Sequence, residues 1–374
     1  MASPLNQLIS LGQSFWLDNI RRGFTRSGEL RRLIDVDGLR GETSNPTIFE
    51  KAIAESDDYD DAVKELVAAK KTTAEVYDAL TTDDVREACD AFRDLYNATK
   101  GGDGYVSIEL PPKFSNDTDA SIAEGLRLWS LVGRPNLMVK VPATDEGIPV
   151  IRRLISEGIN VNITLMFGEA YYAKVIDAYM SGLEDRRTKG LPLQQVASVA
   201  SCFVSRVDTE ADKRLADAMD GVDAARRARI EALLGKTAIA NSKRLYRLYK
   251  ESIATDRFKG LAAAGARRQR PLWASTSTKN PKYPDTYYVE ALIGPDTIDT
   301  MPPATIDAFR DHGKVAPTLD GGYDEADRAV DELESLGISL EAITDKLLAD
   351  GLVAFGKSYD ELFAVIEHKV AALC

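Results

Sequence analysis

The stretch that most constrains the fold runs from residue 136 to residue 167, NLMVKVPATDEGIPVIRRLISEGINVNITLMF. Polar and apolar residues alternate near both of its ends, which is typical of β-strands. Between these ends the apolar residues recur at helical spacing, in a segment that Thr144 is placed to cap and Gly158 to end. The stretch is therefore predicted to be a βαβ unit with two parallel strands.

The first of these strands carries a lysine, Lys140, on the face opposite to Val139 and Val141. In the second strand, Asn162 and Thr164 alternate with aliphatic residues in the same way. Burying a charged lysine is unfavourable, and a free amine attacks carbonyl carbons. Two interpretations of this strand alone stay open. Lys140 is either a Schiff-base nucleophile or a lysine that pairs with a carboxylate or reaches solvent at the strand end.

Strands alternate with helices along the whole chain. The predicted strands are residues 13–20, 38–45, 104–110, 136–143, 160–165, 196–206 and 270–276, with an eighth in YYVEALIGP, the stretch that includes Tyr288. Eight such alternations predict an α/β fold, a (β/α)8 TIM barrel with additional helices. We interpret residues 1–374 as a single barrel domain, with helical insertions at about 47–100 and 208–265 and a helical C-terminal tail.

Polar residues accumulate where these strands end. In a (β/α)8 barrel the C-terminal ends of the strands meet at one face, and that face carries function. A barrel interior is a packed core, so polar residues that converge there from most of the strands are hard to explain as solvated surface. The candidate site residues are Asp18, Asn45, Glu109, Lys140, Asn162, Thr164, Ser201, Arg206 and Ser275.

Composition excludes several classes of function. The net charge of −12 argues against nucleic acid as a partner, because binding to phosphate backbones needs a concentrated basic surface. No apolar run is long enough to span a membrane. The N-terminal segment has neither a basic leader nor a small-residue cleavage site, so we expect a cytoplasmic protein.

Cysteines and histidines are few. Cys89, Cys202 and Cys374 show no metal-like spacing, and isolated cysteines in an intracellular chain are usually reduced. The two histidines, His312 and His368, both lie in the C-terminal helical and loop region, so they cannot form a histidine cluster. We therefore expect no metal site.

Two of the stretches described above resemble a known family. GETSNPTIFEKAI, residues 41–53, is similar to the Thr-Ser-Asn-Pro signature of transaldolases. NLMVKVPATDEGI with GINVNITLMF is similar to the lysine signature of the same family. The resemblance extends over nearly the whole chain and is to the longer bacterial form. It implies a class I aldolase-type (β/α)8 barrel that moves a dihydroxyacetone unit from a ketose phosphate to an aldose phosphate without a cofactor.

The resemblance also implies roles for the catalytic candidates. Lys140 matches the Schiff-base lysine, and Asp18 matches the acid/base that handles the proton of the C4 hydroxyl. Glu109 matches the carboxylate that assists formation and breakdown of the carbinolamine through a water near Thr164.

The other candidates match residues that bind substrate. Two amides hold the hydroxyls of the dihydroxyacetone unit, a serine contacts the substrate, a phenylalanine packs near the reacting centre, and an arginine and a second serine bind phosphate. These are Asn45 and Asn162, then Ser201, Phe203, Arg206 and Ser275. The loop ASTSTKN is longer than in many members of the family and offers Lys279 where an arginine is often found. Lys279 is therefore predicted to be the second phosphate cation.

The function expected from this resemblance is transfer of dihydroxyacetone from sedoheptulose 7-phosphate to glyceraldehyde 3-phosphate, giving erythrose 4-phosphate and fructose 6-phosphate, in the non-oxidative pentose phosphate pathway. Two alternatives stay open: a Schiff-base aldolase that releases free dihydroxyacetone, and a non-catalytic barrel that binds sugar phosphates. The expected partners are sugar-phosphate substrates. The sequence does not distinguish a monomer from a homodimer.

Overall fold

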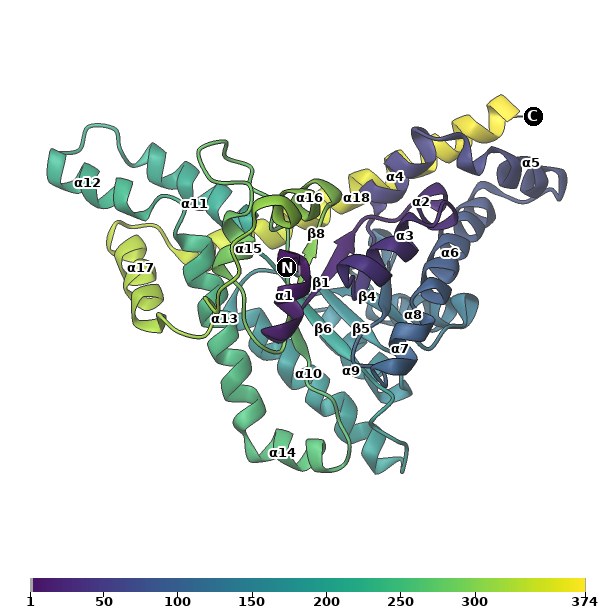
Figure 1. The fold of residues 1–374 in the computed structure, drawn as a ribbon, viewed down its shortest axis with the longest axis horizontal. Coiled ribbons are helices and arrows are strands. Elements are labelled where there is room, and N and C mark those ends of the chain that lie inside the picture. Colours follow the sequence, from purple (N-terminus) through teal and green to yellow (C-terminus); the bar gives the residue numbers. More distant parts are fainter. Residues whose placement is uncertain (1–2, 374) are drawn as a thin grey trace.

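The computed structural model describes residues 3–373 and contains a closed barrel of eight parallel strands (Figure 1). Each strand pairs with the next in the sequence, and β8 pairs with β1. The prediction of a (β/α)8 barrel with additional helices is confirmed. The strands are β1 Gln13–Asp18, β2 Gly41–Thr43, β3 Tyr105–Glu109, β4 Leu137–Pro142, β5 Val161–Met166, β6 Ser198–Phe203, β7 Arg270–Ala274 and β8 Thr297–Met301.

Helices connect the strands and surround the barrel. Up to β3 they are α1 Pro4–Ser10, α2 Arg22–Arg26, α3 Glu29–Arg32, the π-turn η1 Leu33–Asp37, α4 Pro46–Ala54, the 3-10 turn η2 Asp57–Tyr59, α5 Asp60–Ala68, α6 Thr73–Ala91 and α7 Arg93–Ala98. Between β3 and β7 they are the 3-10 turn η3 Pro112–Phe114, α8 Thr118–Val132, α9 Gly147–Glu157, α10 Glu169–Thr188, α11 Ser205–Asp217, α12 Ala224–Leu233, α13 Thr237–Ala254 and α14 Asp256–Ala263. The remaining helices are α15 Tyr287–Ala291, α16 Pro303–His312, α17 Tyr323–Ser335 and α18 Leu340–Leu373.

The predicted βαβ unit forms as β4, α9 and β5. The hydroxyl of Thr144 accepts a hydrogen bond from the backbone N–H of Gly147 at 2.9 Å, at the start of α9. Gly158 ends the helix in the left-handed conformation, with φ +89°. Gly158 confirms the stop read from the sequence, whereas α9 begins only at Gly147, with Glu146 as its N-cap and no side-chain cap bond, so Thr144 closes the turn that precedes the helix. In β4, Val139 and Val141 face the helices.

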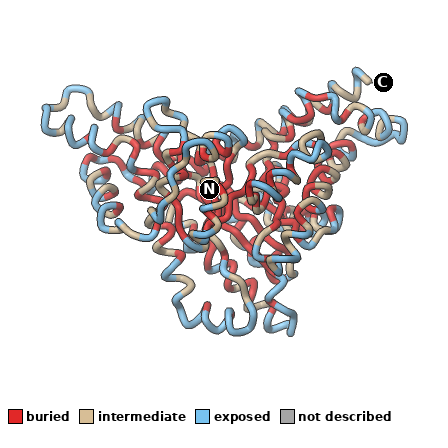
Figure 2. The backbone as a smooth tube through the Cα atoms, viewed as in Figure 1, coloured by how far each residue is buried: buried red, intermediate tan, exposed pale blue. Residues whose placement is uncertain are grey.

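The barrel has two apolar layers that the period-two alternation separates. Residues that point outward pack against the helices, and residues that point inward fill the barrel below the ends of its strands. Buried residues accordingly concentrate around the strands, whereas the outer helices are largely exposed (Figure 2). The inner layer contains Trp16, Tyr105, Met138, Ala197, Val199, Leu272, Ala274 and Ile298. It forms an apolar floor beneath the C-terminal ends of the strands.

The prediction of the eighth strand is wrong. Tyr287–Ala291 is the short helix α15, and β8 lies further along, at Thr297–Met301. YYVEALIGP has the aromatic and β-branched residues typical of strands, but the hydroxyl of Tyr288 donates to Asp208 on α11 at 2.9 Å. β8 has polar residues on both faces, because Thr300 points into the barrel while Asp299 points outward to accept a hydrogen bond from Thr276. This second polar face obscured the strand.

Two other boundaries differ from the predictions. β6 ends at Phe203, so Arg206 lies in the first turn of α11 and not at the end of a strand. The helical tract predicted from Thr47 to about Lys100 is divided into four helices, α4 to α7, and begins at Pro46. Divided helices allow this segment to fold against both the barrel and the C-terminal helix.

The long helix α18 runs beside α4 and α5 and also contacts the end of β5 (Figure 1). A side chain at Gly351 of α18 would come within 2.8 Å of Leu165, so the helix approaches the strand closely there. Leu165 has a positive φ of +55° at an irregularity in the pairing of β5 with β6. This irregularity turns Leu165 toward α18 while Thr164 faces the barrel mouth. Within residues 3–373, no helix has the length and apolar character needed to cross a membrane.

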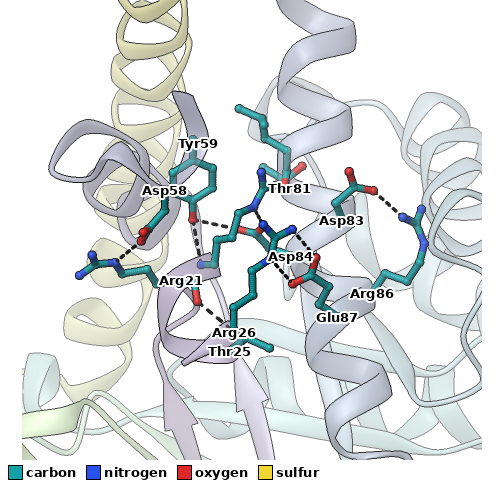
Figure 3. Close-up of polar contacts among 12 residues, drawn as sticks. Arg21, Thr25, Arg26, Asp58, Tyr59, Thr81, Asp83, Asp84, Arg86 and Glu87 are labelled. Carbon is teal, nitrogen blue, oxygen red and sulfur yellow. Dashed lines mark hydrogen bonds and ion pairs between the residues drawn. The ribbon is translucent and has the colours of Figure 1, made fainter. Parts of the chain in front are cut away.

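A buried ion pair anchors the segment that follows β1. Arg22 Nε donates to Asp84 Oδ1 at 2.7 Å, and only 3% and 1% of the two side chains are exposed. Tyr59 donates its hydroxyl to the other oxygen of Asp84 at 2.8 Å (Figure 3). The guanidinium of Arg22 lies over the Tyr59 ring, 4.7 Å from its centroid. This cluster ties α2, η2 and α6 together.

Replacing one partner of this pair should destabilise the protein strongly. In Asp84→Ala the guanidinium of Arg22 stays buried without its counterion, so the free energy of unfolding should fall by about 3 to 5 kcal/mol. The double variant Arg22→Met with Asp84→Leu should lose much less, because apolar side chains of similar size replace both charges. Urea unfolding of the three proteins measures the difference. Equal losses in the single and double variants would contradict this account.

Candidate active site

Lys140 lies at the centre of the barrel mouth. Its side chain is buried, and its Nζ donates to the backbone carbonyl of Ser44 at 2.9 Å and lies 3.4 Å from Glu109 Oε2. Strand register places Glu109, Lys140 and Asn162 at one level on β3, β4 and β5. The hydroxyl of Ser44 donates to the Ser107 carbonyl at 2.7 Å, which fixes the position of the carbonyl that Lys140 uses. The amine is therefore held by a rigid backbone acceptor.

Asp18, at the end of β1, faces the same space. Thr43 donates its hydroxyl to Asp18 Oδ1 at 2.7 Å, and the oxygens of Thr43 and Thr300 are 2.8 Å apart. A hydroxyl has one proton, so Thr300 donates to Thr43 when Thr43 donates to the carboxylate. Burial raises the pKa of Asp18, although the charge of Lys140 and the hydrogen bond from Thr43 oppose the rise. Asp18 is therefore a stronger base than an exposed aspartate.

Glu109 and Thr164 both present buried atoms without partners. Glu109 Oε1 and Thr164 Oγ1 are inaccessible to solvent and have no hydrogen-bond partner within residues 3–373. Burial raises the pKa of Glu109, and Lys140 opposes that rise. Buried polar atoms are nearly always bonded to protein or ordered water, so unpaired atoms beside Lys140 suit a water or a substrate hydroxyl.

Both polar atoms of the Asn162 amide bond to neighbouring side chains. Its Nδ2 donates to Ser107 Oγ at 3.0 Å, and its Oδ1 accepts from Ser201 Oγ at 2.7 Å. Asn45 is oriented differently, because its Oδ1 accepts from the backbone N–H of Ile48 at 3.0 Å and caps α4. This cap leaves the Nδ2 of Asn45 as the group available to a ligand, since Asn45 lines the cavity.

Two cations and two serines lie on the opposite side of the mouth. The guanidinium of Arg206 stacks over the ring of Phe203, 4.9 Å from its centroid. Lys279 Nζ donates to Ser277 Oγ at 2.8 Å. Burial lowers the pKa of Arg206, and burial together with the charge of Arg206 lowers the pKa of Lys279. Ser275, with a positive φ of +57°, lies beside them. Two neighbouring cations, one of which lowers the pKa of the other, are suited to an anion.

A cavity of about 380 Å³ joins these groups. The predicted residues that line it are Asp18, Asn45, Lys140, Thr164, Ser201, Phe203, Arg206, Ser275 and Lys279. Glu109 and Asn162 do not line it but contact residues that do. Among residues 3–373, no three histidine, cysteine, aspartate or glutamate side chains are grouped as metal ligands would be.

Sequence reasoning missed several residues of this cavity. Thr43 and Thr300 orient Asp18, and Thr43 belongs to the Thr-Ser-Asn-Pro stretch, which could have revealed it. Lys51 comes from α4 and Phe355 from α18. Lys51 belongs to the same GETSNPTIFEKAI stretch, whereas Phe355 has no sequence signal, because only the packing of α18 at the mouth brings it to the cavity.

Comparison with known proteins agrees with this geometry. Residues 15–366 match the model of the family described as Transaldolase/Fructose-6-phosphate aldolase. The chain belongs to this family. It is 45% identical over 376 residues to a transaldolase of Trichodesmium erythraeum (strain IMS101), covering 100% of this chain and 99% of that protein. It is 46% identical over 373 residues to a transaldolase of Thermobifida fusca (strain YX), covering 100% of both.

In this transaldolase-family chain, a buried carboxyl holds the start of the loop that follows β7. Asp299 on β8 accepts a hydrogen bond from Thr276 Oγ1 at 2.8 Å, and its Oδ2 is buried without a partner in the described part of the chain. Burial raises the pKa of Asp299 to about 7. Thr276 directly follows Ser275, so Asp299 fixes one end of the loop that leads to Lys279.

Asp299 should therefore make the protein less stable as the pH rises from about 4 to about 7. Between the ordinary carboxyl pKa of about 4 and the folded value, the folded state keeps a proton that the unfolded state has lost, so raising the pH favours unfolding by up to about 1.4 kcal/mol per pH unit. Asp299→Asn should flatten the plot of unfolding free energy against pH, measured by urea unfolding. Some slope should remain, because burial also raises the pKa of Asp208 to about 7. An unchanged slope in the variant would exclude Asp299 as its source.

Proposed function

We propose that this chain is a transaldolase that moves a dihydroxyacetone unit from sedoheptulose 7-phosphate to glyceraldehyde 3-phosphate through a Schiff base on Lys140. The observation that carries the proposal is the position of the Lys140 amine, buried at the barrel mouth between the carboxyl groups of Glu109 and Asp18, with Arg206 and Lys279 across the same cavity. A nucleophile, proton carriers and an anion site are the parts that this transfer requires.

In the first step, Lys140 Nζ attacks C2 of the ketose, and a carbinolamine forms. Loss of water from the carbinolamine gives the imine, and this loss requires a proton donor near the C2 oxygen. Glu109 is suited to that role, because its raised pKa keeps more of it protonated and because its Oε1 has no partner within residues 3–373. A water held between Glu109 and Thr164 would carry the proton to the substrate.

In the second step, the imine accepts electrons. Asp18 takes the proton of the C4 hydroxyl, the C3–C4 bond breaks, and its electron pair moves toward the imine nitrogen to give an enamine. The aldose phosphate leaves, and the acceptor aldehyde enters. The same steps in reverse join the three-carbon unit to it. The raised pKa of Asp18 suits a base that takes a proton and later returns it.

The enamine must survive until the acceptor arrives. The pair of Asn162 and Ser201 provides neutral hydrogen-bonding groups at the level of Lys140, which suit the hydroxyls of the bound unit. The rings of Phe203 and Phe355 form apolar parts of the cavity wall. Apolar walls limit the access of water, which would otherwise hydrolyse the intermediate.

Two alternative functions predict experimental results that differ from those expected of a transaldolase. The matching family includes fructose-6-phosphate aldolases, which by their name cleave rather than transfer. An aldolase would release dihydroxyacetone without an acceptor aldose phosphate, whereas a transaldolase needs the acceptor to turn over. A non-catalytic sugar-phosphate barrel would bind ligand and form no adduct. The names of the relatives favour the transaldolase.

The proposal includes a cytoplasmic location. Cys89 and Cys202 are both buried and unpaired, as is usual for proteins in reducing compartments. Cys374 lies outside the described residues.

Borohydride trapping with fructose 6-phosphate tests the chemistry. Wild-type protein should gain the mass of a reduced adduct at Lys140, and Lys140→Ala should gain none. Asp18→Asn should still be trapped but should turn over more slowly by a factor on the order of 10² to 10⁴, because it keeps the shape of the side chain and loses the proton acceptor. Intact mass with peptide mapping locates the adduct. An adduct on another lysine would refute the assignment of Lys140, and near-normal turnover in Asp18→Asn would move the base elsewhere.

The side of the cavity that carries Arg206 and Lys279 should bind the phosphate group of the substrate. Arg206→Ala should lower kcat/KM for fructose 6-phosphate by about 10- to 100-fold, because hydrogen bonds to charged groups are lost. Lys279→Ala should have a smaller effect, since a flexible ammonium in a loop binds less specifically than a guanidinium fork. Activity on unphosphorylated fructose should change little in both variants and serves as the internal control. Equal losses on both sugars would mean that these residues support the fold rather than bind phosphate.

A further inference from the structure

The loop that carries Lys279 is held by an extended set of contacts away from the cavity. This loop, residues 275–286, which we call the phosphate loop, joins β7 to α15 and contains Ser275, Ser277 and Lys279. Its first residues are fixed by the bond of Thr276 to Asp299. Its later residues contact the helices that follow β6, whose role the sequence did not indicate.

Asp212 on α11 is the centre of these contacts. Its Oδ2 accepts a hydrogen bond from the Tyr283 hydroxyl at 2.6 Å, and its Oδ1 accepts from the backbone N–H of Gly235 at 2.9 Å. One carboxylate thus joins the phosphate loop to the turn between α12 and α13. Short bonds to an ionised acceptor are among the stronger hydrogen bonds in proteins.

Gly235 brings the loop and the turn into direct contact. It has a positive φ of +73°, and a Cβ at this position would lie 2.7 Å from the Tyr283 ring. Its carbonyl accepts a hydrogen bond from the Tyr287 hydroxyl at 2.9 Å. The Tyr283 ring therefore packs against the backbone of Gly235, and its hydroxyl reaches Asp212. These two contacts set both the position and the direction of the ring.

We propose that Asp212 and Tyr283 are positioning residues for Lys279, and that α11, α12 and α13 form a platform that holds the phosphate loop. The inference rests on the proposed function. It follows from the shared element α11, because Arg206 is in the first turn of this helix and Asp212 lies further along it. One rigid helix thereby sets the positions of both cations of the phosphate site.

The physical reason is conformational entropy. Lys279 lies in a loop without regular structure, and its side chain donates to Ser277 of the same loop. If the loop backbone were free, binding a phosphate would require ordering both the backbone and the side chain, which weakens binding. Anchoring the loop beforehand leaves only the side chain to be ordered. The anchor should therefore act on phosphorylated ligands and leave the imine chemistry at Lys140 intact.

The test is Tyr283→Phe, which removes the hydroxyl and keeps the ring on Gly235. For fructose 6-phosphate, kcat/KM should fall by about 2- to 10-fold, through a higher KM with kcat retained. For unphosphorylated fructose it should stay at the parent value. Asp212→Asn is the second variant and should show the same selectivity. Tyr323→Phe is the matched control. Tyr323 is the first residue of α17, and its hydroxyl also donates to an aspartate, Asp320.

A double-mutant cycle shows whether the anchor acts through Lys279. If it does, Tyr283→Phe should have no further effect on fructose 6-phosphate in a Lys279→Ala background. Additive losses, equal losses on both sugars, or no loss in either anchor variant would overturn the inference. Binding of fructose 6-phosphate to Lys140→Ala protein, measured by calorimetry with and without Tyr283→Phe, gives the same comparison without turnover. A parent enzyme that binds the sugar but does not transfer would contradict the proposed function alone.

Discussion

The arrangement of the site depends on burying an amine at the mouth of the barrel. A buried lysine requires acceptors, and the best placed of these is the backbone carbonyl of Ser44, at 2.9 Å. This carbonyl comes from the turn that Asn45 caps and Pro46 constrains at the start of α4. The conformation of one short turn therefore sets the direction of the amine, while the carboxyl group of Glu109 lies farther away, at 3.4 Å. Around Lys140, the backbone carbonyl of Ser44 is therefore the fixed partner, and the side chain of Glu109 is the adjustable one.

Much of this arrangement could be predicted, because it lies on regular strands. The period of two fixes which face of β4 carries Lys140, and parallel register then places Glu109 and Asn162 at the same level on the adjacent strands. Polar residues at the ends of strands must converge once the barrel closes. The end of β1 follows the same rule, and Asp18 lies where the alternation placed it. The positions of these residues can be predicted from the strands alone, without knowledge of the loops or helices.

The features that could not be predicted depend on contacts between distant segments. Arg206 lies in a helix because β6 ends early, and strand ends are poorly marked in sequence. YYVEALIGP resembled a strand because its tyrosines are typical of strands, whereas in the structure Tyr287 and Tyr288 bind the Gly235 carbonyl and Asp208. Phe355 reaches the cavity only because α18 crosses the end of β5. In each case tertiary contacts decided a feature that local pattern could not.

The contact between Thr43 and Thr300 has a consequence for the synthesis of this protein. Thr300 is on β8, which pairs with β1, so the group that orients the hydroxyl of Thr43 toward Asp18 comes from the strand that closes the barrel. During translation the lysine strand and its carboxylate neighbours emerge long before this strand. Contacts between segments so distant in sequence form slowly, after the more local ones. A nascent chain would thus contain Lys140, the proposed nucleophile, before the proposed base Asp18 was fully oriented, and the complete site would form only when the first and last strands met.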